Sequence, residues 1–387
     1  MSISAHLFKY IDINPKEFLA KGTLAKKISM DKLQPFCRDV PEYEIAKFSG
    51  GAKFRNGDTI MARITPCLEN GKTAMVNILE PDEVGFGSTE FIVFRAKEGY
   101  TDPDFVYYLV KSSIVRDPAI KSMVGSSGRQ RVQTDVVQNL VIPFPNLSEQ
   151  RKIASILKSL DDKIALNTTI NDNLEQQAQA IFRQELLQNG ELPPNWTTGS
   201  LLDIADYLNG LAMQKFRPVD GERGLPVLKI KELRQGFCDY SSELCSPNIK
   251  PEFIVHDGDV IFSWSGSLLV DLWCGGTCGL NQHLFKVTSV KYPKWFYYTW
   301  TAHHLARFVA IAADKATTMG HIKREDLAKA EVIIPDVASM ERIGGVLQPI
   351  YDLVINQRIE NRKLSMLRDS LLPKLMSGEL DVSAIEL

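Results

Sequence analysis

Four consecutive residues, Asn70-Gly71-Lys72-Thr73, resemble the end of a phosphate-binding loop. Such a loop needs another glycine five positions before Gly71, because its backbone N–H groups must cradle the phosphates. Pro66 occupies that position. The pattern therefore predicts no nucleotide site in this segment.

A second pattern resembles the beginning of a metal-dependent nuclease site, because Asp82 follows a proline and Glu90 comes soon after. Ile92 stands where such sites usually carry a lysine, so the two carboxylates would bind a metal ion without its activating partner. The segment 142–145, IPFP, lacks the leading amide or acid and the paired prolines of an amino-methyltransferase loop. We expect a non-catalytic chain, with a nuclease using Asp82 and Glu90 as an alternative.

The cysteines do not predict a metal site. A zinc site would need Cys238 with Cys245 and Cys274 with Cys278, and these pairs enclose six and three residues, which fits zinc knuckles poorly. We expect buried or incidental thiols and no metal or cofactor in this chain. The six cysteines are Cys37, Cys67, Cys238, Cys245, Cys274 and Cys278.

Length and composition allow two cored domains, since the chain has 387 residues, of which 44% are hydrophobic. The N-terminal segment MSISAHLFKY does not resemble a signal peptide, and no long apolar run suggests a membrane span. We expect a cytoplasmic protein. The net charge of −2 argues against a chain that coats nucleic acid indiscriminately, but it allows local basic patches.

Two segments with the spacing of coiled-coil helices occur 190 residues apart, as Ile153 and Ile343 illustrate. In each segment two polar layers, Asn167 and Asn171 or their later counterparts, interrupt the apolar seam. We expect the two seams to pack on each other. Arg368 stands where Ala178 stands in the first copy, which predicts that the second seam opens towards solvent near its end. The predicted seam residues are Ile153, Leu157, Leu160, Ile164, Leu174 and Ile181, followed by Ile343, Leu347, Ile350, Val354, Leu364 and Leu371.

A fainter repeat precedes each helix. A glycine-centred turn at 56–58 and another at 257–259 each lead into an apolar run typical of a strand. The later runs VIPFP at 141–145 and VIIPD at 332–336 also correspond. Offsets that drift from 201 to 190 indicate a shared framework with different surface loops, which is where different specificities would lie.

The expected fold class is therefore α+β. It has two repeated globular α/β domains separated by two long antiparallel coiled-coil helices, with pseudo-twofold symmetry. The expected segments are a first domain at 1–147, a first spacer helix at 148–190, a second domain at 191–337, a second spacer helix at 338–380 and a C-terminal tail at 381–387. The aromatic runs FVYYLV at 105–110 and WFYYTW at 295–300 are interpreted as core rather than as base-stacking platforms.

Four motifs occur in order over nearly the full length of the chain. They are GDTIMARITPCLENGKTA at 57–74, SSGRQRVQTDVVQNLVIPFPNLSEQRKIASIL at 126–157, Pro194-Asn195-Trp196, and LLPKLMSGEL at 371–380. Together they resemble the specificity subunits of type I restriction-modification systems. The first motif resembles the signature of a target-recognition domain, and the second resembles the passage into the first spacer helix. The third resembles the start of the second recognition domain, and the fourth resembles the end of the second spacer helix.

The resemblance implies a non-catalytic subunit that binds a bipartite double-stranded DNA sequence, with one recognition domain for each half. Methyltransferase (modification) subunits, two of them by the family pattern, and restriction subunits would dock on it. The whole complex would then be a site-specific deoxyribonuclease and adenine methyltransferase. S-adenosylmethionine would be bound by the modification subunits, and ATP with Mg by the restriction subunits.

The predicted helix from about Ser148 to Leu187 is long enough to set the spacing between two half-sites. Some 40 residues give ~60 Å at 1.5 Å per residue. Major-groove faces on one side of DNA recur every ~34–36 Å. A scaffold whose coiled coil joins protein partners without nucleic acid is the remaining alternative.

In the first domain the basic and amide residues in and near glycine-containing loops are the candidates for DNA contact. Arg can bind guanine and Gln or Asn can bind adenine through paired hydrogen bonds, whereas Lys more often meets phosphate. These candidates are Lys53, Arg55, Arg63, Asn70, Lys72, Ser127, Arg129, Gln130 and Arg131.

In the second domain the loop equivalent to 126–131 is taken at an offset of 192, so that Gly320 corresponds to Gly128 and Lys323 to Arg131. Trp264 in the segment SWSGS is interpreted as core rather than as an intercalating side chain. The candidates for DNA contact in this domain are Lys215, Arg217, Lys229, Lys231, Arg234, Lys315, Thr317, His321, Lys323 and Arg324.

Overall fold

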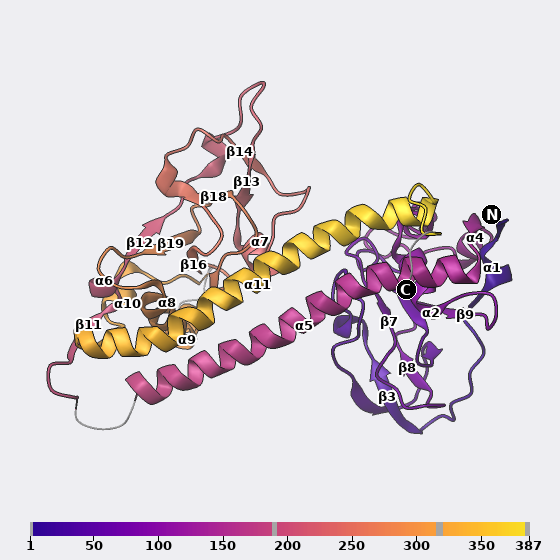
Figure 1. The fold of residues 1–387 in the computed structure, drawn as a ribbon, viewed down its shortest axis with the longest axis horizontal. Coiled ribbons are helices and arrows are strands. Elements are labelled where there is room, and N and C mark those ends of the chain that lie inside the picture. Colours follow the sequence, from indigo (N-terminus) through magenta and orange to yellow (C-terminus); the bar gives the residue numbers. More distant parts are fainter. Residues whose placement is uncertain (1–2, 188–191, 315–319, 384–387) are drawn as a thin grey trace. The chain divides into compact units, whose positions relative to one another are not determined.

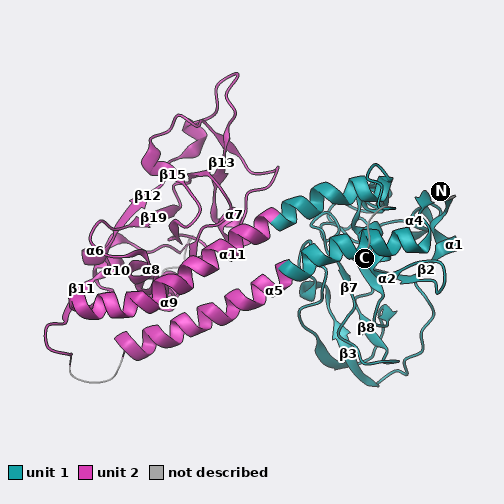
Figure 2. Cartoon of the chain, in the orientation of Figure 1, with its two compact units in different colours: residues 1–163, 364–387 teal, residues 164–363 magenta. Residues whose placement is uncertain are grey.

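The structure is a computed structural model that describes residues 3–187, 192–314 and 320–383. It divides into two compact units (Figure 2). Unit 1 comprises residues 1–163 and 364–387, and unit 2 comprises residues 164–363. Each unit therefore contains a globular part and a part of each of two long helices (Figure 1).

Unit 1 is mixed α/β. Its strands are β1 (Ile3–His6), β2 (Ile11–Ile13), β3 (Leu24–Ile28), β4 (Glu44–Lys47), β5 (Lys53–Phe54), β6 (Thr59–Ala62), β7 (Thr73–Met75), β8 (Gly85–Gly87), β9 (Phe91–Ala96) and β10 (Val141–Phe144). Its shorter helices are α1 (Leu7–Tyr10), the 3-10 turn Met30–Lys32, α2 (Pro103–Lys111), α3 (Ser113–Lys121) and α4 (Thr134–Gln138).

Unit 2 has the same kinds of element in nearly the same order. Its strands are β11 (Thr197–Ser200), β12 (Asp206–Asn209), β13 (Leu225–Leu228), β14 (Leu244–Cys245), β15 (Ile254–Val255), β16 (Val260–Ser263), β17 (Leu269–Leu272), β18 (Cys278–Leu280), β19 (Leu284–Thr288) and β20 (Glu331–Ile334). Its shorter helices are α6 (Leu201–Ile204), α7 (Ile230–Gln235), α8 (Lys294–His303), α9 (Leu305–Asp314) and α10 (Arg324–Ala328), with 3-10 turns at Met213–Lys215 and Pro251–Phe253.

The two units have identical sheet topology. One four-stranded sheet has the order β2-β9-β6-β7 in unit 1 and β12-β19-β16-β17 in unit 2. The other has the order β4-β3-β8-β5 or β14-β13-β18-β15, with the single parallel pair β3–β8 or β13–β18 at its centre. A two-stranded ladder, β1-β10 or β11-β20, completes each set. The predicted repeat of two α/β domains with two long helices is confirmed.

The aromatic runs form the cores, as the sequence predicts. Helix α2 begins at Pro103 after the N-cap Asp102, whose side chain accepts a 3.1 Å hydrogen bond from the Phe105 backbone N–H. Its residues 105–110 are all buried, so this helix is surrounded by apolar side chains. In unit 2, helix α8 buries Trp295 and Trp300 in the same way.

The two long helices are α5 (Leu147–Leu186) and α11 (Val337–Ser377). Within unit 2 they run antiparallel, because Asn167, Glu175 and Glu185 pair with successively earlier residues of α11. The partners are Asn361 at 2.9 Å, Arg358 at 2.6 Å and Arg342 at 2.7 Å.

The seam residues are buried to different degrees. Asn167 and Asn171, the interrupting polar residues, are buried, and Asn167 Nδ2 donates to Glu360 Oε2 at 2.7 Å as well as to Asn361. Of the predicted apolar seam, Ile153, Leu157, Ile343, Leu347 and Val354 are buried. Leu160, Ile164, Leu174, Ile181, Ile350, Leu364 and Leu371 are half-buried.

The prediction that Arg368 opens the second seam towards solvent is wrong. Arg368 is 6% exposed, and its Nη1 lies 2.6 Å from Asp161 Oδ1, also in unit 1. Tyr108 OH donates to the other carboxylate oxygen of Asp161 at 2.7 Å. Comparing Arg368 only with its repeat counterpart Ala178 missed Asp161, the residue that pairs with it.

The compact units do not coincide with the five predicted segments, since each unit contains parts of both long helices. The predicted division into domains and spacers therefore stays a prediction about function. The first helix ends at Leu186 rather than at 190, and residues 188–191 lie outside the described residues. None of the described helices is long and apolar enough to cross a membrane.

Candidate nucleic-acid interface

Two of the predicted arginines of unit 1 meet at one carboxylate, that of Glu90. Arg131 donates three hydrogen bonds to the Glu90 carboxylate, at 3.0, 2.9 and 2.8 Å. Arg63 Nε lies 3.8 Å from Glu90 Oε2. The hydrogen bonds from Arg131 are the largest cause that lowers the pKa of Glu90, so the carboxylate stays ionised at neutral pH. We call Arg63, Glu90 and Arg131 the arginine cluster.

Backbone hydrogen bonds hold the arginine cluster at the end of β6. The Val132 N–H donates to the Arg63 carbonyl at 2.8 Å, and the Arg63 N–H donates to the Glu90 carbonyl at 2.9 Å. The Thr65 N–H also donates to the Gln130 carbonyl at 3.0 Å. The segment around residue 131 is therefore attached to the sheet, which fixes the Arg131 side chain.

The loop before Arg131 is exposed and closed on itself. Val124 and Arg131 pair as an isolated antiparallel bridge, and the Arg129 N–H donates to the Ser126 carbonyl at 3.0 Å. Gly128 has φ +77°, a conformation that favours glycine. Ser127 and Arg129 are exposed and Gln130 is half-buried. The loop thus presents an exposed arginine two residues before Arg131.

The other candidates of unit 1 lie apart from this cluster in the hydrogen-bond network. Arg55 binds Glu17 at 2.8 Å, and Arg95 binds the same carboxylate and Asp58. Lys53 lies over the Phe48 ring, and Lys72 Nζ donates to the Met30 carbonyl at 2.8 Å. Asn70 is exposed.

The equivalent place in unit 2 follows from the matching backbone hydrogen bonds. The Ile322 N–H donates to the Trp264 carbonyl at 3.1 Å, and the Gly266 N–H donates to the Gly320 carbonyl at 3.1 Å. The corresponding bonds in unit 1 run from the Val132 N–H to the Arg63 carbonyl and from the Thr65 N–H to the Gln130 carbonyl. Trp264 is therefore equivalent to Arg63. His321, which precedes Ile322, is equivalent to Arg131, which precedes Val132.

This equivalence corrects the loop comparison made from sequence. The offset between the copies is 190 here and not 192, so Gly320 corresponds to Gln130 and Lys323 to Gln133. The helices α4 and α10, which follow this segment, share the offset of 190. A glycine seen in both loops suggested the wrong offset, whereas the helix after them fixes the register.

Trp264, His283 and His321 come together in unit 2, and we call them the aromatic cluster. The Trp264 ring centroid lies 6.3 Å from that of His283 and 6.2 Å from that of His321. Trp264 Nε1 donates to Asn209 Oδ1 at 3.0 Å, and Ser265 Oγ lies 3.1 Å from His283 Nδ1. Trp264 is half-buried against the unit 2 core, so its interpretation as a core residue is only partly right.

The remaining candidates of unit 2 differ in how they are engaged. Arg217 and Lys229 share Glu243, and Lys231 lies 3.2 Å from Asp239 Oδ2. Lys215 and Arg234 are exposed, as are Lys323, which precedes α10, and Arg324 in its first turn. Lys315 and Thr317 lie outside the described residues.

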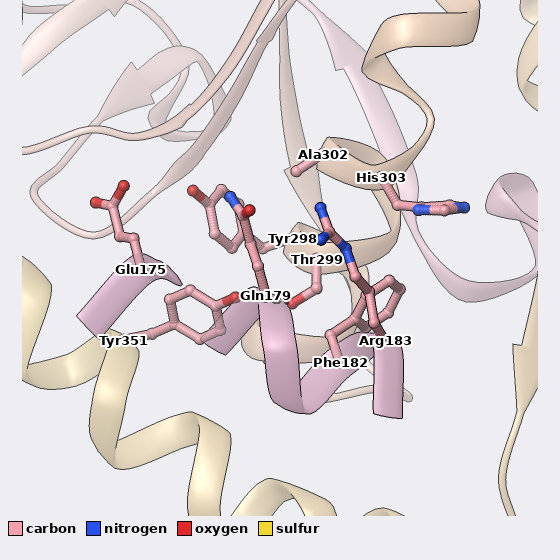
Figure 3. Close-up of a pocket in the computed structure, with 9 residues that line it drawn as sticks. All are labelled: Glu175, Gln179, Phe182, Arg183, Tyr298, Thr299, Ala302, His303 and Tyr351. Atoms are coloured by element: carbon pink, nitrogen blue, oxygen red, sulfur yellow. Dashed lines mark hydrogen bonds between the residues drawn. The ribbon is translucent and has the colours of Figure 1, made fainter. Parts of the chain in front are cut away.

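A pocket of about 210 Å³ lies in unit 2 where α5, α8 and α11 meet. Figure 3 shows Glu175 and Arg183 from α5, His303 from α8 and Tyr351 from α11 at its wall. Thr299 Oγ1 donates to Tyr351 OH at 3.3 Å, and burial lowers the pKa of His303. None of the predicted DNA-contact residues that the structure describes lines it, and we regard it as part of the packing between helices and domain.

Asp82 and Glu90, the two carboxylates of the nuclease alternative, have different surroundings. The Asp82 side chain is fully exposed, whereas Glu90 is engaged by Arg131. Among the cysteines, Cys245, Cys274 and Cys278 are buried, and burial raises the pKa of Cys274 to about 12. Within the described residues no three His, Cys, Asp or Glu side chains are grouped as metal ligands.

Comparisons with known proteins agree with the four sequence motifs. A family model described as the type I restriction modification DNA specificity domain matches residues 17–176. The MjaIX specificity subunit of Methanocaldococcus jannaschii is 26% identical over 315 residues, which are 73% of this chain and 70% of that protein. The HindI specificity subunit of Haemophilus influenzae is 22% identical, with 84% of this chain and 87% of that protein covered. Residues 17–176 therefore match the type I DNA specificity domain, and the chain is similar over most of its length to type I specificity subunits.

A solved specificity subunit has the same fold. The S subunit of a type I restriction-modification system from M. genitalium matches with a TM-score of 0.57 at 13% identity, over 97% of this chain and 96% of that chain. The family resemblance predicted from sequence is thus confirmed.

Sequence reasoning missed two members of the clusters, namely Glu90, which contacts two arginines, and His283, which lies next to Trp264. The offset of 193 that relates β9 to β19 marks positions 90 and 283 as equivalent. It does not identify the side chains that Glu90 and His283 contact, which only the fold brings together.

Proposed function

We propose that this chain is the DNA-recognition subunit of a type I restriction-modification complex and that each unit binds one half of a bipartite target. The observation that carries the proposal is the repeat itself: two units with identical strand order present different side chains at equivalent loop positions. A common frame with different surface chemistry fits two half-sites of different sequence.

In unit 1 the proposed base contacts are Arg63, Arg129, Gln130 and Arg131. Arginine fits the O6 and N7 acceptors of guanine, and glutamine fits adenine. Glu90 holds Arg131 in one orientation, so less side-chain entropy is lost on binding. Lys53 and Lys72, the lysine candidates of unit 1, would meet phosphates and position the DNA without reading its sequence.

The long helices are proposed to set the distance between the half-sites. Helix α5 has 40 residues, or ~60 Å of α-helix, which suffices for readers one to two DNA turns apart. The helices would also dock the partner proteins, namely modification subunits, two in the family pattern, and restriction subunits. The five segments at 1–147, 148–190, 191–337, 338–380 and 381–387 are proposed as their functional division.

Chemistry is assigned to those partners. The modification subunits would bind S-adenosylmethionine and methylate adenine, and the restriction subunits would use ATP and Mg for cleavage. This chain would contribute sequence recognition only. The proposed location is the cytoplasm, as the sequence leads us to expect.

Salt dependence of DNA retention tests the function. We expect the full chain, purified with a modification subunit, to retain duplex DNA. The logarithm of its binding constant should fall linearly with the logarithm of the salt concentration, because contacts to phosphates release counterions. Retention that is absent or insensitive to salt would favour the protein-only scaffold. Metal-dependent cleavage by the chain alone would favour the nuclease that uses Asp82 and Glu90.

A further inference from the structure

The two units place chemically different side chains at the same three positions of their shared frame. The first position, at the end of β6 or β16, is Arg63 in unit 1 and Trp264 in unit 2, and its carbonyl accepts a backbone hydrogen bond from the segment before α4 or α10. The second position, in that segment, is Arg131 in unit 1 and His321 in unit 2. The third position, before the central strand β9 or β19, is Glu90 in unit 1 and His283 in unit 2. The arginine cluster and the aromatic cluster are therefore equivalent sites.

The arginine cluster offers charged donors. Arg131 is held by Glu90 and Arg63 lies beside the same carboxylate, so two guanidinium groups converge on one spot. Guanidinium groups suit the paired acceptors of guanine and also phosphate oxygens.

The aromatic cluster offers flat rings and imidazole nitrogens instead. Asn209 fixes the Trp264 indole through a 3.0 Å hydrogen bond, and Ser265 Oγ lies 3.1 Å from His283 Nδ1. His321 is exposed, and its ring forms an edge-to-face pair with Trp264, the two planes being 79° apart. The first two rings are thus held in place before any ligand arrives, which reduces the entropy lost on binding.

We infer that Trp264, His283 and His321 form the base-contacting site of unit 2, so that this unit recognises its half-site with aromatic and imidazole groups where unit 1 uses arginines. The inference rests on the proposed DNA-reading function and names residues that carry it in the second half. An imidazole N–H donates to purine N7 or O6, and the indole ring provides an apolar surface for the thymine methyl group.

The experiment compares variants of the full chain, each purified with a modification subunit and selected on a randomised duplex library that is then sequenced. His321→Ala is the main variant because His321 is exposed and its loss should leave the fold intact. His283→Ala is the second variant. His256→Ala is the matched control, since His256 is exposed and contacts Thr277 rather than the cluster. Arg131→Ala marks the half read by unit 1.

We expect His321→Ala and His283→Ala to lose sequence preference in one half of the target and to bind the wild-type target about tenfold more weakly, the size of one good base contact. Arg131→Ala should lose preference in the other half, and His256→Ala should match the wild type. Wild-type preference in both histidine variants would overturn the inference while leaving the proposed function intact. Equal loss in both halves, at unchanged melting temperature, would also overturn it. A wild-type protein that enriches no two-part motif would overturn the proposed function and the inference together.

Discussion

Buried charges in unit 1 show what single residues contribute to the helix pair. Arg368 and Asp161 are both 7% exposed in their side chains and form a 2.6 Å ion pair that Tyr108 completes. Removing one partner of such a pair leaves an uncompensated buried charge, whereas removing both can be nearly neutral.

We predict that Arg368→Leu destabilises unit 1 by about 3–5 kcal/mol and that the double variant Asp161→Leu/Arg368→Leu recovers part of this loss. All five tryptophans belong to unit 2, so their fluorescence reports that unit, whereas far-UV circular dichroism reports both units. Urea unfolding should therefore show the shift mainly by circular dichroism. Lys374→Leu, which removes an exposed charge from the same helix, is the control and should change stability by less than ~0.5 kcal/mol. If Arg368→Leu and Lys374→Leu lowered the free energy of unfolding equally, the importance of the buried ion pair would be contradicted.

Lys111 provides a pH-dependent test in the same unit. Burial, and then the charge of Arg368, lower its pKa to about 8. Because the unfolded chain keeps the ordinary pKa of 10.5, it binds more protons than the folded state between these values, so folding stability should rise as pH rises from about 8 to about 10.5. Lys111→Met should remove this rise. Thermal melts followed by circular dichroism at several pH values check it, and parallel curves for variant and wild type would show the assignment to be wrong.

At the scale of elements, the long helices contact each other through a seam that mixes apolar and polar layers. Asn167 is fully buried and binds both Asn361 and Glu360 of the facing helix. A polar layer in a coiled coil fixes the register of the helices at some cost in stability. The proposed spacing function depends on that register.

We predict that Ile164→Lys separates the helices locally, because a charged side chain cannot be buried in the seam without a partner. The variant should still bind each half-site but lose its preference for one gap length. Binding to duplexes with gaps of increasing length measures this. Ala165→Lys adds the same charge at the exposed neighbouring position and should keep the wild-type preference. An unchanged preference in Ile164→Lys would rule out the proposal that the long helices set the distance between the half-sites.

Elements were more predictable from sequence than the contacts between them. Heptad spacing and repeated strand runs predicted both long helices and the two-copy fold, because periodicity follows from which face is buried. The partners of Arg368 and Arg131 were not predictable in this way. Asp161 is 207 residues from Arg368, and Glu90 is 41 residues from Arg131, so only the fold brings them together.

At the scale of the whole molecule, recognition is proposed to rest on two copies of one frame with different loops. The formal net charge is only −2, so DNA binding would depend on local groups such as the arginine cluster and not on overall attraction. The different chemistry of the arginine and aromatic clusters predicts that the two halves of the target differ in sequence. The shared topology makes the arginine cluster and the aromatic cluster equivalent in position. Their different residues would make them bind different bases.

The most direct test of this account is to select DNA with the full wild-type chain. The chain, co-purified with a modification subunit, would be mixed with a randomised duplex library at moderate salt, and the retained DNA would be sequenced. We predict two short, different motifs separated by a gap of fixed length and no preferred sequence. Retention without enrichment, or enrichment of a single continuous motif, would contradict the claim that the two units read two half-sites.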